Sequence, residues 1–250
     1  MMKHSMSMPL IISVLLCLAT PLMHAQGGPY GEWQKGCDAG DGDACKSLGF
    51  WDETGAGEIV GQSKDLAQAA VWYGRAVAIY SRNCDNGKMS DCTSLGDMYS
   101  TSDGIMKDLD RAVVLLHKGC DGGDMRGCLF LGYMYRDGKG VSKDASQAVT
   151  LIRRGCDSGI MNGCVALGKI YRDGIGGTIW TGIMKDMPQA VSLFLKACDS
   201  GNADGCLFLG EVYDSGDGVP QNKPKAVELY RKACTIESYS NACDKLPGKN

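Results

Sequence analysis

The sequence predicts an all-α protein, a right-handed α/α solenoid stapled by disulfides, and three observations support this prediction. Cysteines recur with a period of 36 residues over much of the chain. Apolar residues between them follow the spacing of one helical face. The cysteines also come in pairs that are eight or nine positions apart. A fixed period of this length is typical of proteins whose repeated units pack on their neighbours.

The N-terminal stretch predicts a secretory signal peptide. Lys3 precedes an apolar segment, 10–19, that is too short to span a bilayer. Ala25 ends the stretch at the expected cleavage point. We therefore divide the chain into a signal peptide, 1–25, and a repeat solenoid, 26–250. We expect the mature protein to be secreted or periplasmic.

Composition argues against two classes of partner. The chain has 26 basic and 29 acidic residues, and its basic residues form no block, so it lacks the electrostatic features of a nucleic-acid-binding protein. After the signal segment, no stretch is apolar for long enough to span a membrane. No cofactor motif is present, and we expect none to be bound.

The cysteines after the signal segment predict a disulfide framework. Their number is even, and each lies close to one other in the sequence. The expected pairs are Cys37–Cys45, Cys84–Cys92, Cys120–Cys128, Cys156–Cys164, Cys198–Cys206 and Cys234–Cys243. Zinc sites favour Cys-x2-Cys spacing, which is absent, and the mature chain has a single histidine, His117. We therefore expect no metal.

Two repeats are longer than 36 residues, and the excess can be located. Six extra residues between Cys156 and Cys198 lie in the loop 175–184. The first repeat has a longer loop around 57–61 and seven further residues before Cys84. Seven residues are about two helical turns, so the sequence predicts a longer second helix there.

The residue pattern within each repeat predicts two helices. The second carries one apolar face and is preceded by an aspartate that can cap it, as at Asp108, Asp144 and Asp186. The first carries Leu-Gly-x-x-Tyr, whose glycine should let the partner helix approach closely. We expect five helix pairs, with half-repeats at Pro29–Cys37 and Ser240–Leu246. Each disulfide would then join one repeat to the next.

The motif Cys-Asp-x-Gly-x-x-x-Gly-Cys-x-x-Leu-Gly-x-x-Tyr resembles the Sel1-like repeat, a relative of the tetratricopeptide repeat. With a cysteine pair at each junction, the chain is similar to the Hcp-type cysteine-rich secreted proteins, a bacterial group described as beta-lactamases. The likeness covers about residues 30–245. It implies a helical solenoid and, as one alternative, an enzyme or penicillin-binding protein acting on a beta-lactam or cell-wall amide.

The residues themselves carry no hydrolase motif. Neither Ser-x-x-Lys nor Lys-Thr-Gly occurs, and a catalytic triad could use only His117, which we expect on the surface. The enzyme hypothesis therefore rests on resemblance alone. We favour a scaffold that binds a protein or peptide on its concave face or on its loop inserts. A beta-lactam-like small molecule remains the alternative ligand.

The insert 175–184 contains the strongest single candidate for a partner contact. The repeat does not need this insert, and it carries Ile179, Trp180 and Ile183 among glycines. An apolar loop of this kind either contacts a partner or folds back on its own repeat. We predict that Trp180, with Ile179 and Ile183 beside it, anchors a partner.

Overall fold

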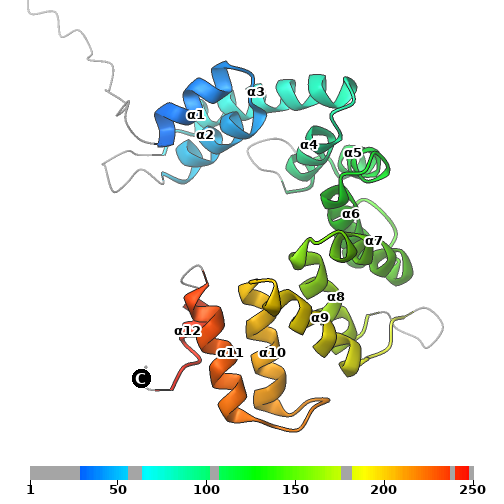
Figure 1. The fold of residues 1–250 in the computed structure, drawn as a ribbon. Helices are drawn as coiled ribbons and strands as arrows, with labels where there is room; N and C mark the ends of the chain where they lie inside the picture. The colour runs from blue at the N-terminus through cyan, green and yellow to red at the C-terminus, as the bar shows by residue number, and fades with distance from the viewer. Residues whose placement is uncertain (1–28, 56–63, 102–106, 176–181, 237–239, 248–250) are drawn as a thin grey trace, which may run out of the picture.

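The protein is an α/α solenoid in which pairs of antiparallel helices follow one another along an open arc (Figure 1). The structure, a computed structural model, describes residues 29–55, 64–101, 107–175, 182–236 and 240–247. Within these ranges the only extended pairing is one antiparallel bridge between Ile175 and Ile183. The signal segment and the loop at 57–61 lie outside the described residues.

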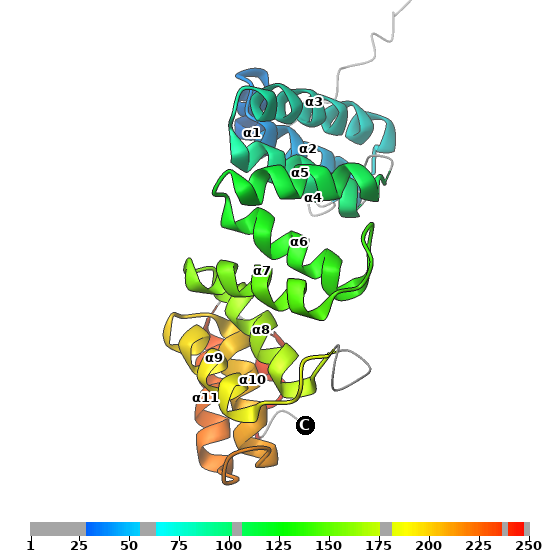
Figure 2. The same ribbon diagram turned by 90° about the vertical axis from the view of Figure 1, so that its right-hand side faces the viewer.

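Five helix pairs form the body of the arc. The first helices of the pairs are α2 (Gly42–Thr54), α4 (Met89–Thr101), α6 (Met125–Asp137), α8 (Met161–Asp173) and α10 (Ala203–Ser215). The second helices are α3 (Leu66–Asp85), α5 (Leu109–Asp121), α7 (Ala145–Asp157), α9 (Met187–Asp199) and α11 (Lys223–Thr235). A helix precedes them, α1 (Pro29–Asp38), and a short one follows, α12 (Ser240–Cys243). Figure 2 shows the second helices α3, α5, α7 and α9 stacked along the outer side.

The predicted helix caps are confirmed. Asp108, Asp144 and Asp186 each accept a hydrogen bond from a backbone N–H in the first turn of the helix that follows. Each cap satisfies an amide that the helix itself cannot pair. Pro188 lies in the first turn of α9, where a missing N–H does little harm. Local sequence therefore fixes where the second helices begin.

The glycine of each Leu-Gly motif lets the two helices of a pair pack closely. A Cβ at Gly132 would lie 2.7 Å from the side chain of Ile152, and one at Gly168 would lie 2.6 Å from Phe194. Both partners are fully buried. A large side chain from the second helix therefore fills the space that the glycine leaves.

Another set of glycines lies where neighbouring repeats meet, and Gly163 shows how little space remains there. A Cβ at this position would lie 2.9 Å from the backbone N of Cys156 and 3.2 Å from the backbone C of Gly155. We expect Gly163→Ala to destabilise the protein by about 1–3 kcal/mol, because the crowding atoms belong to the backbone. The matched control is Gly74 in α3, which has nothing within 4 Å of such a Cβ.

Gly74→Ala should stabilise the protein by roughly 0.5–1 kcal/mol, because alanine is the better helix former. Urea unfolding of the two single variants measures both effects. Equal shifts in the same direction would show that the two glycines have the same role, and this prediction would be wrong.

The six predicted cysteine pairs are bonded in the structure. Each joins the end of one repeat to the first helix of the next, with Cα atoms 4.4–4.8 Å apart. Eleven of the twelve cysteines are buried, and Cys45, Cys92, Cys128, Cys164 and Cys206 have no exposed surface. The disulfides are therefore part of the core.

The longer second helix in the first repeat is also confirmed. Helix α3 has 20 residues, whereas α5, α7, α9 and α11 have 13 each. Tyr73 packs on Gly49 as Ile152 packs on Gly132. Tyr73 precedes the cysteine near the end of its helix by eleven residues, but Ile152 precedes its own by only four. The seven extra residues therefore extend the C-terminal end of α3.

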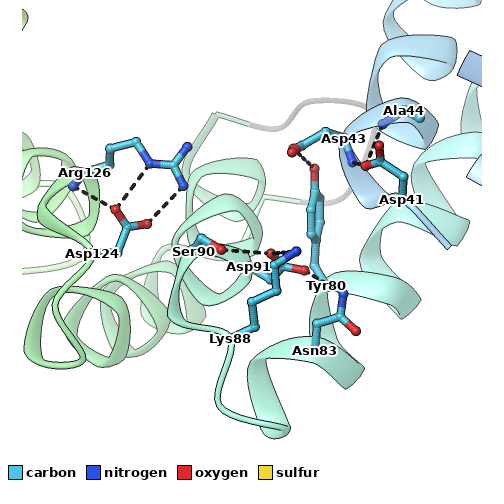
Figure 3. A network of polar contacts seen from close by, with 10 residues as sticks. All are labelled: Asp41, Asp43, Ala44, Tyr80, Asn83, Lys88, Ser90, Asp91, Asp124 and Arg126. Atoms are coloured by element: carbon cyan, nitrogen blue, oxygen red, sulfur yellow. Dashed lines mark hydrogen bonds and ion pairs between the residues drawn. The ribbon is translucent and has the colours of Figure 1, made fainter. Parts of the chain in front are cut away.

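Polar contacts hold this extension in place (Figure 3). The ring of Tyr80 lies over Gly42, where a Cβ would be 2.5 Å away, and its hydroxyl donates to Asp43 of α2. Burial raises the pKa of Tyr80, so the hydroxyl stays protonated as a donor. At the next junction Asn83 donates to the buried carboxylate of Asp91 over 2.7 Å. The extension is therefore fixed at both of its ends.

The Asn83–Asp91 pair replaces two small residues. The equivalent positions in the later repeats are Gly119 with Gly127 and Gly155 with Gly163. Larger side chains fit at the first junction because they hydrogen-bond to each other. Lys88 also forms an ion pair with Asp91 at 3.0 Å, so the buried carboxylate is well compensated.

Candidate functional site

The first helices form the inner row of the arc. First helices of successive repeats contact each other, α4 with α6 and α8 with α10. Contact along this row brings the first helices closer together than the second helices, which lie on the outer side (Figures 1 and 2). Side chains that leave α4 and α6 away from their partner helices therefore share one face, and so do those of α8 and α10.

One position of the first helix varies from repeat to repeat. The residue directly after Leu-Gly is Phe50, Asp97, Tyr133, Lys169 or Glu211 along the row. All five are exposed or half-buried. The neighbouring leucine and glycine are constant because they make the helix packing. Because this position is exposed in every repeat and its residue type varies, its side chains are available to recognise a partner.

Aromatic and basic side chains gather in the middle of this row. We call Tyr133, Arg136, Lys169, Arg172 and Phe208 the inner strip. The Arg136 guanidinium lies 4.9 Å from the centre of the Tyr133 ring. Lys169 and Arg172 flank the Phe208 ring at 5.0 and 5.3 Å. Rings beside cations offer both apolar area and positive charge to a ligand.

The strip is anchored in the protein core. Phe208 stacks on the fully buried Phe194 of α9, with ring centroids 5.5 Å apart. Burial raises the pKa of Tyr133, which favours the neutral phenol. The two rings are therefore held by packing, so little conformational freedom would be lost when a ligand covers them.

The charges of the strip are only partly compensated. Arg136 binds Asp137 at 2.7 Å and lowers the pKa of that carboxyl group through this hydrogen bond. Arg172 binds Asp173 at 2.7 Å and also reaches Glu211 at 3.6 Å. Lys169 is exposed, and no carboxylate of the described residues lies within ion-pair distance of it. Its ammonium group is available to a partner.

Charge alternates along the inner row. Helices α6 and α8 each carry two basic residues and one acidic residue. Helix α4 has two acidic residues and α10 has three, and neither has a basic one. Asp91 of α4 is buried and paired, so the acidic side chains that a ligand on the row could meet are Asp97 on one side of the basic helices and Glu211 and Asp214 on the other.

The structure places the sequence-predicted site residues differently. Ile179 and Trp180 lie outside the described residues, and their role as a partner anchor stays a prediction. Ile183 is described: its backbone pairs with Ile175, and its side chain is half-buried against the core around α8 and α9. It helps to close the base of the insert.

His117 differs from the expected surface histidine. Its side chain is half-buried, and its ring meets the edge of Tyr135 with centroids 6.4 Å apart. The reason is that the first helix of the next repeat lies against this side of α5. Among the described residues, no group of three or more histidines, cysteines or carboxylates could hold a metal ion.

Sequence reasoning missed the inner strip. Its residues are not a motif, since each repeat has a different set. The available signal was the changing residue after the constant Leu-Gly, which marks an exposed position on the first helix. The basic residue three positions later, at Arg136 and Arg172, was a second signal.

Fold and surface together define a disulfide-stapled α/α repeat protein with a varied inner face. The Sel1 repeat family matches residues 42–78, 92–124, 126–160, 162–202 and 203–235. The chain belongs to the Sel1 repeat family. Proteins built from these repeats generally mediate protein interactions. The sequence matched none of the curated proteins with which it was compared.

Comparison with solved structures found similar repeat proteins, and one of them superposes well enough to show the same fold. A Sel1 repeat protein from Oxalobacter formigenes superposes with a TM-score of 0.61 at 23% identity, over 83% of this chain and 76% of that one. Cysteine-rich protein B from Helicobacter pylori is 28% identical, with a TM-score of 0.39, over 56% of this chain and 97% of that one. An immunity protein from Pseudomonas aeruginosa has a TM-score of 0.48 at 24% identity, over 67% and 60%.

Two findings bear on location. Six disulfides indicate an extracytoplasmic protein, because such bonds persist in oxidising compartments. None of the helices described in the structure combines the length and apolar character that crossing a membrane requires.

Proposed function

We propose that this protein is a secreted or periplasmic scaffold that binds a protein or peptide segment along its inner row of first helices. The disulfides and the apolar N-terminal stretch support export. The Sel1 repeats support a role in protein interaction. The inner strip supplies the place where such a segment would bind.

One observation carries the proposal: the inner strip holds fixed aromatic rings beside an exposed lysine that forms no ion pair with the described residues. Phe208 is supported by Phe194, and Lys169 lies 5.0 Å from the centre of the Phe208 ring, with no carboxylate of the described residues within ion-pair distance. Tyrosine and arginine, which the strip also contains at Tyr133, Arg136 and Arg172, are among the residue types that dominate binding energy at protein interfaces.

The alternation of charge indicates the kind of segment. An acidic stretch would lie over α6, which carries Arg136, and over α8, which carries Lys169 and Arg172. Basic residues on either side of that stretch would face α4 and α10. Complementary charge of this kind speeds association and fixes register more than it adds affinity.

Charge reversal in the strip tests the proposal. A partner captured from periplasmic or cell-surface extract should bind Lys169→Glu about tenfold more weakly than wild type, because repulsion replaces attraction at the centre of the site. The affinity of the Lys169→Glu variant for the partner should also depend less on salt concentration than the affinity of wild type. Arg231→Glu on α11 is the matched control, since Arg231 is exposed on a second helix and the charge change is the same.

Titration calorimetry at two salt concentrations provides the measurement. Binding by the control should stay within about twofold of wild type. If Arg231→Glu weakens binding as much as Lys169→Glu does, the segment does not lie on the inner row and the proposal fails.

A further inference from the structure

The last disulfide is the most accessible of the six. Cys234 is half-buried, and Cys243 is 9% exposed. The other ten cysteines are each at most 1% exposed. A disulfide is reduced when a thiolate reaches one of its sulfur atoms, so an exposed bond reacts before enclosed ones. The Cys234–Cys243 bond is therefore the one that a thiol reductant would reach first.

This bond holds a short element in place. Helix α12 has four residues, packs on α11 and is too short to be stable as an isolated helix. Ala242 is fully buried, and Leu246, which follows the helix, packs against the same core cluster. These are few apolar contacts compared with those of a full repeat helix. Reduction of this bond would release α12, while the five helix pairs keep their own disulfides.

The residues after Cys243 continue the inner row. Lys245 follows the second cysteine of its pair by two residues, as Phe208 does one repeat earlier. Phe208 stacks on Phe194 with ring centroids 5.5 Å apart, and Nζ of Lys245 lies 5.6 Å from the centre of the Tyr230 ring. Phe194 and Tyr230 are equivalent as well, because each precedes the first cysteine of its pair by four residues. Lys245 therefore occupies the next place on the inner row after Phe208.

At this place Lys245 changes the charge beside the inner strip. Its Nζ lies 2.9 Å from one carboxylate oxygen of Glu211, and the other oxygen lies 3.6 Å from Nη1 of Arg172. Glu211 is thus shared between Lys245 and a cation of the inner strip. The side chains of Lys245 and Glu211 are 41% and 32% exposed, so a ligand on the row could reach both. Without Lys245, this end of the strip would lose one positive charge and Glu211 would lose a partner.

We propose that the Cys234–Cys243 bond is a reducible latch that sets the charge preference of the inner strip. This inference rests on the proposed function, because it concerns the same binding surface. With the bond formed, Lys245 neutralises Glu211 and adds to the cations that attract an acidic segment. With the bond broken, Lys245 leaves the row, and Glu211 attracts basic residues instead.

The reductant of this latch is a dithiol. One of its thiolates attacks a sulfur atom of the bond and forms a mixed disulfide, and its second thiol then displaces the cysteine. Two electrons and two protons pass to the protein, so that Cys234 and Cys243 become thiols and the dithiol becomes a cyclic disulfide. Exchange with an oxidised dithiol runs the same steps in reverse and closes the latch again.

Stepwise reduction of the full, oxidised protein tests the latch itself. The protein is treated with rising concentrations of dithiothreitol, free thiols are blocked with N-ethylmaleimide, and the blocked peptides are identified by mass spectrometry. Cys234 and Cys243 should be blocked at the lowest concentration, while the helical circular dichroism signal is almost fully kept. Blocking of any other pair at the same or a lower concentration would overturn the proposal.

NMR titration at low salt with two blocked peptides, hexaglutamate and hexalysine, tests the charge preference. Replacing Cys234 and Cys243 by alanine should weaken binding of hexaglutamate about two- to fivefold and strengthen binding of hexalysine by a similar factor. Lys245→Ala should have the same two effects with the bond intact, and adding it to the cysteine variant should change nothing further. Lys232→Ala is the matched control, because it removes a lysine of α11 that pairs with Asp199. It should leave the ratio of the two affinities unchanged.

Lys169→Glu separates this inference from the proposed function. If this variant binds hexaglutamate as wild type does, the peptide does not use the inner strip, and both the proposed function and the latch fail. If Lys169→Glu weakens binding, but the cysteine variant and Lys245→Ala keep the wild-type ratio of affinities, the proposed function stands and the latch is overturned. Circular dichroism checks that each variant is folded.

Discussion

Reduction of all six disulfides is expected to unfold the protein at room temperature. Each bond closes a nine-residue loop, which is worth about 2–3 kcal/mol in the chain-entropy model. The last loop is one residue longer. Together the six bonds contribute about 12–18 kcal/mol, which is as large as the roughly 5–15 kcal/mol by which folded proteins are usually stable. Circular dichroism during urea unfolding, with and without a phosphine reductant, measures the effect.

Two double variants separate the contribution of a central bond from that of a terminal one. Replacing Cys156 and Cys164 by alanine should remove the covalent link between two well-packed repeats and lower the urea midpoint. Replacing Cys234 and Cys243 should have a smaller effect, because only α12 follows this bond among the described helices. If the fully reduced chain unfolds at the same urea concentration as the oxidised one, the disulfides do not stabilise the fold.

Phe194→Ala is expected to be the most damaging single substitution in the core. Phe194 is fully buried, lies over Gly168 and stacks on Phe208. Removing the ring should cost about 3–5 kcal/mol, because it leaves a cavity between α8, α9 and α10. Phe208 would also lose its support, so binding at the inner strip should weaken.

The matched control is Phe50→Ala, which removes the same ring from a side chain that is 59% exposed. Its effect on stability should stay within about 0.5 kcal/mol. Thermal unfolding of the two variants gives the comparison. A similar loss of thermal stability in both variants would mean that neighbouring side chains fill the space left by Phe194. In that case the packing around Phe194 would not contribute the expected stability.

The fold could be read from the sequence because it depends on local signals that recur. Cysteine spacing, the aspartate caps and the Leu-Gly motif each act within one repeat or between neighbours. Even the length of α3 followed from counting residues. The contact that accommodates it did not, because Tyr80 meets Gly42 across 38 positions in the chain. The position of Gly42, three residues before the second cysteine of a pair, holds methionine or alanine in the other repeats.

The candidate surface was harder to predict, for a physical reason. Recurring residues such as the tyrosine of the Leu-Gly-x-x-Tyr motif serve packing, while recognition depends on what differs between repeats. Lys169 and Phe208 become neighbours only when α8 and α10 lie side by side. Lys245 is an inconspicuous residue in the sequence. It gains meaning when the structure shows that it lies on Tyr230 as Phe208 lies on Phe194.

Hydrogen–deuterium exchange of the captured complex tests the central claim most directly. The account predicts that a bound partner slows exchange in the first helices α6, α8 and α10, around Tyr133, Lys169 and Phe208. The second helices α7, α9 and α11 should exchange as in the free protein. Protection confined to the second helices, with none on α6 and α8, would contradict the claim that the inner row is the binding surface.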